Sequence, residues 1–93
     1  MLIARPLQAF TLGGRHILSC KVVKDNPHMF VGKEMWFYSA GSIPKQIRIE
    51  GLSTASDIAR QVYDFHYTGA VVCQEEIIAD SILTDEADRQ GIK

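Results

Sequence analysis

The stretch Ile47-Arg-Ile-Glu-Gly-Leu52 is the centre of the fold that the sequence predicts. Residues 46–50 alternate strictly between polar and apolar side chains, which is the pattern of a β-strand covered on one side. Gly51 is expected to end this strand. Upstream, the aromatic-rich residues 35–38 (Met-Trp-Phe-Tyr) predict another strand. The middle of the chain is therefore expected to contribute two strands to a small sheet.

Two segments after this strand are expected to be α-helices, each closed by a glycine. In the first, Ile58, Val62 and Phe65 lie at the i, i+4 and i+7 positions of one helical face, and Gly69 can adopt the left-handed conformation that ends a helix. The second helix is expected to run from about residue 75 to residue 90, with its acidic side chains outward.

The N-terminal part of the chain predicts a β-hairpin followed by a short helix. Residues 7–12 and 15–18 flank Gly13-Gly14, a pair that can adopt the positive φ angles of a two-residue turn without steric penalty. Residues 19–24 could form a short helix, which Pro27 keeps from extending further. The expected fold is thus a mixed one of α-helices and β-strands.

Length, composition and charge limit the classes of function. The 93 residues suit one domain spanning residues 1–93, and a content of 46% hydrophobic and 23% charged residues is typical of a globular protein. A formal net charge of -1 provides no long-range attraction for a phosphate backbone, so nucleic acid is not favoured as a partner.

The sequence also predicts where the protein is located. Its first apolar run is too short for a secretory signal, and no stretch approaches the roughly 18 apolar residues of a membrane span. Cys20 and Cys73 lack C-x-x-C spacing, so we expect free thiols in a reducing compartment. The expected location is intracellular, in the cytoplasm or nucleus, without membrane contact.

The order of these features resembles the BTB/POZ domain, a protein-interaction module, and especially its potassium-channel tetramerisation branch. The resemblance spans about residues 7–92. It is carried by Thr11-Leu-Gly-Gly-Arg-His-Ile17, Asn26-Pro-His-Met-Phe30, Ile47-Arg-Ile-Glu-Gly-Leu52, Val62-Tyr-Asp-Phe-His-Tyr-Thr-Gly69 and Glu86-Ala-Asp-Arg-Gln-Gly-Ile92. It implies an α+β fold, in which an N-terminal β-hairpin and a small sheet pack against a cluster of α-helices.

The same resemblance implies a function in protein–protein contact. It implies homo-oligomerisation, and an adaptor role in which the domain docks a cullin scaffold of a ubiquitin ligase. Large apolar side chains are also crowded between residues 29 and 38, either because some contact a partner or because the sheet is covered on both faces by the domain's own helices. The predicted protein-binding residues are Met29, Phe30, Trp36, Phe37, Tyr67 and Thr68. For Tyr67 a place in the core, with the hydroxyl at the rim, is equally open.

Chemical sites are weakly indicated. His16, Cys20 and His28 carry imidazole and thiol groups that suit zinc, with Cys73 or His66 as a fourth ligand, but we expect them to be dispersed structural residues. No recognisable nucleophile motif surrounds either cysteine. We expect no catalytic residues, no cofactor and no metal. The alternatives are a small metal-dependent regulator or enzyme using these three residues, or an unrelated small α+β regulatory protein.

Overall fold

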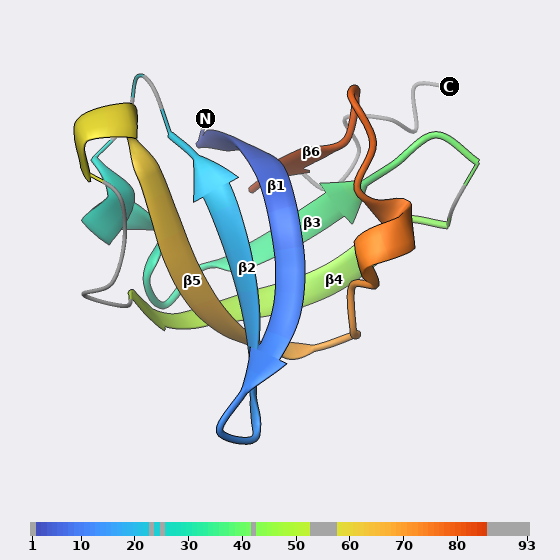
Figure 1. Ribbon diagram of the computed structural model, residues 1–93, viewed down its shortest axis with the longest axis horizontal. Coiled ribbons are helices and arrows are strands. Elements are labelled where there is room, and N and C mark those ends of the chain that lie inside the picture. The colour runs from blue at the N-terminus through green and yellow to red at the C-terminus, as the bar shows by residue number, and fades with distance from the viewer. Residues whose placement is uncertain (1, 23, 25, 42, 53–57, 86–93) are drawn as a thin grey trace.

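The computed structural model describes residues 2–22, 24, 26–41, 43–52 and 58–85. Six β-strands form a closed antiparallel barrel in the order β1-β2-β5-β4-β3-β6. The strands are β1 (Ile3–Leu12), β2 (Arg15–Lys21), β3 (Glu34–Tyr38), β4 (Lys45–Leu52), β5 (Val62–Gly69) and β6 (Ile82–Thr84). Three short 3-10 turns connect them: η1 (Pro27–Phe30), η2 (Ile58–Arg60) and η3 (Gln74–Glu76) (Figure 1).

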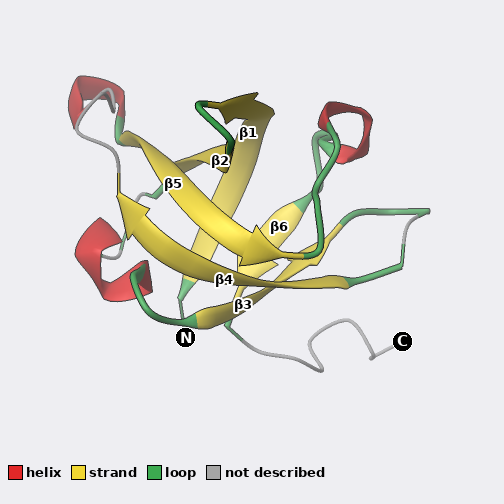
Figure 2. Ribbon diagram, turned by 90° about the horizontal axis from the view of Figure 1, so that it is seen from below, coloured by secondary structure: helices red, strands yellow, loops and turns green. Residues whose placement is uncertain are grey.

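The order of the strands contains a Greek key. β3, β4 and β5 follow one another as neighbours, and β6 returns over a long connection to lie beside β3. The hairpin of β1 and β2 fills the gap between β5 and β6 and so closes the barrel. In Figure 2, β3, β4 and β5 cross the front of the barrel, and β1 and β2 lie behind them.

The predicted N-terminal hairpin is confirmed. β1 and β2 are antiparallel, with Leu12 opposite Arg15. Gly13 and Gly14 have φ angles of 60° and 81°, the left-handed region that a two-residue turn of this kind requires. Further along, the register shifts between Pro6 and Gln8, which marks a β-bulge in β1.

The interior of the barrel is filled with apolar side chains, as in other small barrels. Each strand contributes alternate residues, as the two-residue period of a β-strand dictates. Phe30 of η1 is fully buried and stacks on Phe65, with ring centroids 5.3 Å apart. The core consists of Leu2, Ala4, Leu18, Cys20, Val22, Phe30, Met35, Phe37, Ile47, Ile49, Phe65, Tyr67, Val72 and Leu83.

The predicted α+β fold is wrong, and with it the BTB/POZ-like cluster of helices. The described residues form strands and 3-10 turns and contain no α-helix. The predicted helix that ends at Gly69 is the strand β5. Tyr63, Phe65 and Tyr67 alternate along β5 and point to the interior, so the period of two governs this segment rather than the helical period.

Three smaller predictions also need correction. Residues 19–21 of the predicted first helix belong to β2, and Gly51 lies within β4 rather than at its end. Within the predicted C-terminal helix the structure has η3 and β6, while residues 86–93, including the last segment of the BTB resemblance, lie outside the described residues.

The predicted strands at residues 35–38 and 46–50 are confirmed as parts of β3 and β4. No helical turn in the described ranges has the length or apolar character to cross a membrane.

Candidate interaction surface

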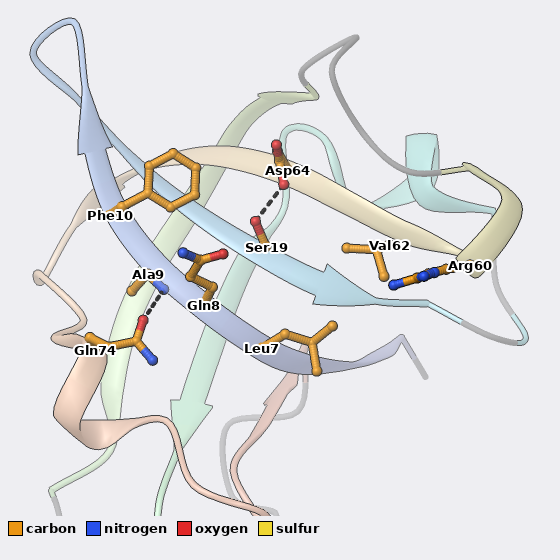
Figure 3. A pocket seen from close by; sticks show the side chains of 9 residues that line it. All are labelled: Leu7, Gln8, Ala9, Phe10, Ser19, Arg60, Val62, Asp64 and Gln74. Atoms are coloured by element: carbon orange, nitrogen blue, oxygen red, sulfur yellow. Dashed lines mark hydrogen bonds between the residues drawn. The ribbon is translucent and has the colours of Figure 1, made fainter.

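A groove of about 700 Å³ lies on the outer face of the sheet formed by β1, β2 and β5. It is lined by Leu7, Gln8, Ala9, Phe10, Ser19, Arg60, Val62, Asp64 and Gln74 (Figure 3). Among the described residues, this lining combines apolar side chains, two amides, a hydroxyl, a guanidinium and a carboxylate. The groove therefore offers hydrogen bonds and apolar contact to a ligand.

The β-bulge determines which side chains of β1 enter the groove. Because Pro6 pairs with Cys20 and Gln8 pairs with the next residue, Ser19, Leu7 is an extra residue without a partner on β2. Leu7 and Gln8 consequently both lie in the lining of the groove. The side chain of Leu7 is 48% exposed. A large apolar group is thus presented to solvent by an irregularity of the strand.

A polar pair occupies the floor of the groove. Ser19 lies opposite Asp64 across the β2–β5 ladder, and Ser19 Oγ donates a hydrogen bond to Asp64 Oδ1. Ser19 is buried and Asp64 is half-buried. The neighbouring Cys20 points into the barrel, where burial and, to a smaller extent, the Asp64 charge raise the pKa of its thiol. Its thiol is therefore held in the protonated, unreactive form.

On the other side of β1, the side chain of Gln74 reaches the backbone of the strand. The N–H of Ala9 donates to Gln74 Oε1 at 2.8 Å. Figure 3 shows Gln74 and Asp64 on opposite sides of β1, each with its hydrogen bond drawn. Gln74 begins η3, so the position of that turn decides whether its amide reaches the strand.

Hydrogen bonds from the barrel hold η3 in place. Lys45 Nζ lies 2.5 Å from Glu76 Oε1 and donates to the carbonyl of Val71 at 2.7 Å. Ser39 Oγ donates to the Glu76 carbonyl at 2.6 Å. The N–H of Val72 donates to the buried Tyr67 hydroxyl at 3.0 Å. The connection between β5 and β6 is therefore fixed against β3, β4 and β5.

A second, smaller hollow adjoins the groove. It measures about 290 Å³ and is lined by Arg5, Pro6, Leu7, Ile77, Ile78, Ala79 and Ser81. Leu7 belongs to both hollows, and Ile78 is 43% exposed. The two hollows with Leu7 between them are called the bulge surface below.

The structure separates the residues that the sequence predicts as protein-binding. Phe30, Phe37 and Tyr67 are buried in the barrel, and Trp36 is half-buried on β3. Met29 is 55% exposed on η1, and the exposed Thr68 donates to Glu50 Oε2 at 2.9 Å. The six side chains do not form one surface.

The three candidate zinc ligands, His16, Cys20 and His28, lie in different surroundings. His16 lies on β2, half-buried, with its ring 5.9 Å from that of Tyr67, while Cys20 is in the interior and His28 is exposed on η1. Over the described part of the chain, no three His, Cys, Asp or Glu side chains are gathered as metal ligands would be.

Sequence reasoning missed the residues of the bulge surface. Leu7, Phe10 and Ile78 are ordinary apolar residues in the sequence, and a bulge becomes visible only when the register between two strands is known. The comparisons with known proteins add no assignment: no family model matches the chain, and neither a curated protein nor a solved structure does.

Proposed function

We propose that the chain is a protein-interaction module that self-associates, and that the bulge surface makes the contact. The observation that carries this proposal is the exposure of Leu7 between two adjoining hollows. Apolar side chains gathered on a surface favour association, because contact with a partner removes them from water.

The surroundings of Leu7 have the composition of a protein interface. Ile78 is exposed nearby, and Phe10 is half-buried in the groove. Arg5 and Gln8 add polar groups around these apolar side chains. An apolar centre with a polar rim is the usual arrangement at protein–protein contacts.

The bulge itself supports a role for Leu7. In a regular strand, consecutive side chains alternate between the two faces, whereas a β-bulge redirects a side chain. A bulge also disrupts the ladder locally, and such irregularities are enriched at functional sites.

The cullin-adaptor role has no such support. The BTB/POZ resemblance that implied this role also implied an α+β fold, which the barrel contradicts. Tyr67 and Thr68, which the resemblance places at the end of a helix, lie on the strand β5. We therefore propose self-association without naming a ubiquitin-ligase partner.

Light scattering from dilute to concentrated solution tests the proposal. The molar mass of the wild-type chain should rise with concentration, and Leu7→Glu should shift that rise to higher concentration because a buried contact cannot accommodate an unpaired charge. Ile43→Glu is the matched control, since Ile43 is 82% exposed and outside both hollows. A strict monomer at the highest concentration refutes self-association, and an equal effect of both variants refutes the bulge surface as its site.

A further inference from the structure

One edge of β1 has no paired strand over most of its length, although η3 contacts β1 on this side. β1 pairs with β6 only through Ile3 and Ala4, whereas its pairing with β2 continues from Arg5 to Leu12. Within the described ranges, no strand therefore lies beside the second edge of β1 after Ala4. The turn of the hairpin also projects beyond the rest of the barrel (Figure 1).

The register shows which backbone groups face this open edge. Leu12 and Arg15 flank a two-residue turn, so they are a hydrogen-bonded pair, and Phe10 with Ile17 is the next such pair. Antiparallel pairing alternates, so the N–H and C=O groups of Ala9 and Thr11 point away from β2. The hydrogen bond from the Ala9 N–H to Gln74 confirms this direction for Ala9.

Gln74 occupies the place of a neighbouring strand. Its side-chain Oε1 accepts from Ala9 as the carbonyl of a paired strand would. The contact is exposed, and a side-chain amide can rotate away from it. A backbone carbonyl from an added strand can replace it when η3, which contacts β1, shifts away from Ala9.

The open segment is suited to pairing with itself. Residues 7–12, Leu-Gln-Ala-Phe-Thr-Leu, contain no charged residue, no proline and no glycine. Natural edge strands are commonly protected by lysine, proline or inward charges, which prevent pairing with another chain. Here an identical strand would bring no like charges together, and a two-fold symmetric contact requires such self-complementarity.

We infer that β1 pairs in antiparallel fashion with β1 of a second copy, with the two-fold axis at Phe10. In this register Ala9 faces the partner's Thr11 and Thr11 faces the partner's Ala9, and each pair exchanges two backbone hydrogen bonds. Phe10 faces the partner's Phe10 in the closer, non-hydrogen-bonded position, where aromatic pairs stabilise a sheet. An axis at Ala9 would instead bring Thr11 against the bulged Leu7, whose register is irregular.

This inference rests on the proposed self-association and specifies its geometry. Disulfide trapping tests it in a Cys73→Ala background, in which the remaining native Cys20 is buried. Under mild oxidation Phe10→Cys should give a covalent dimer rapidly, because directly opposite residues of an antiparallel pair have Cβ atoms close enough for a disulfide.

Gln8→Cys and Leu12→Cys provide the matched controls. Each alone should cross-link slowly, because identical residues two positions from the axis lie about 13 Å apart along the strands. Mixed together, the two variants should form a disulfide between unlike copies, because Gln8 faces the partner's Leu12. This mixture also tests the register without replacing Phe10.

Two further variants test the backbone contact. Gln74→Ala should lower the dissociation constant of the dimer by roughly threefold, because it removes an acceptor that competes for the Ala9 N–H. Thr11→Pro should raise that constant at least tenfold, because it deletes an N–H that faces the partner. Circular dichroism checks that each variant keeps the wild-type fold.

The outcomes separate the inference from the proposed function. Self-association that Leu7→Glu weakens, without rapid trapping of Phe10→Cys or of the mixture, overturns the pairing of β1 and leaves the bulge surface as the contact. Similar trapping rates for all three single variants overturn it as well. A chain that is monomeric at every concentration refutes both.

Discussion

The imidazole ring of His66 on β5 lies over Gly51 on β4. A methyl group added to Gly51 would come within 2.3 Å of His66 Cε1 and 2.4 Å of Nε2. The two residues are partners in the β4–β5 ladder, next to the register shift between Ile49 and Gly51. The half-buried ring thus occupies the volume that any other side chain at position 51 would need.

Gly51→Ala should lower the free energy of unfolding by about 1–2 kcal/mol, since the His66 ring must rotate out of its place. In a His66→Ala background the same change should cost much less, because the clashing ring is gone. Urea unfolding of the four proteins measures this coupling. An equal cost in both backgrounds would show that the contact with His66 is not the cause.

Gly69 closes β5 with a φ of 106°, and a Cβ there would lie 2.9 Å from the carbonyl oxygen of Gln46. Gly69→Ala should therefore destabilise the protein by about 2–3 kcal/mol, since it combines backbone strain with a clash against backbone. Gly41→Ala is the control: its φ is 83°, but no atom lies within 4 Å of the added Cβ. It should cost about 1 kcal/mol in the same urea titration. Equal losses would exclude the contact with Gln46 as a cause.

Tyr67→Phe should destabilise the protein by about 1–3 kcal/mol, because the buried N–H of Val72 loses its acceptor. Tyr63→Phe on the same strand is the control and should cost less, because Tyr63 is only half-buried. Hydrogen exchange at Val72, followed by NMR, should accelerate in Tyr67→Phe alone. Unchanged exchange at Val72 would show that the phenol does not protect this amide.

The titration of Tyr67 predicts a loss of stability at high pH. Burial raises the pKa of Tyr67 above the ordinary value of 10.0, against opposing effects of the Val72 N–H and of Lys45. The unfolded chain then loses this proton at lower pH than the folded one does. The corresponding stability is complete below about pH 10 and is lost as the pH rises towards the folded-state pKa.

Urea unfolding at a series of pH values from neutral to alkaline checks this linkage. The decline of stability above pH 10 should be shallower in Tyr67→Phe than in the wild type. Cys20, whose pKa burial also raises, contributes equally to both proteins and cancels in the difference. Parallel declines would show that Tyr67 has no raised pKa.

Local signals in the sequence predicted about half of the barrel. Gly13-Gly14 between two apolar segments indicated the hairpin, and the alternation in residues 46–50 indicated most of β4. β5 resembles a helix in sequence because Val62 and Phe65 are three residues apart and fit one helical face, whereas on the strand they lie on opposite faces. The alternation of aromatic side chains along β5 was the stronger signal, since aromatic residues favour strands.

The remaining features depend on pairing that is distant in sequence. β6 has only three residues, too few for a periodic pattern, and is defined by its neighbours β1 and β3. The crowded aromatic residues between 29 and 38 indicated surplus apolar surface, yet Phe30 and Phe37 are buried in the barrel. The exposed apolar groups of the bulge surface lie elsewhere, because Leu7 is turned outward by a register shift.

The placement of β6 between β1 and β3 has a consequence for synthesis on the ribosome. Ile3 of β1 pairs with Thr84 of β6, which is translated near the other end of the described chain, so the barrel cannot close before Thr84 has been synthesised. A nascent polypeptide lacking residues 82–84 leaves β1 and β3 each with an unpaired edge where β6 would lie, and unpaired strand edges promote aggregation. The barrel therefore closes only after residues 82–84 have been translated. A pause in translation before these residues prolongs the time during which the unpaired edges of β1 and β3 are exposed.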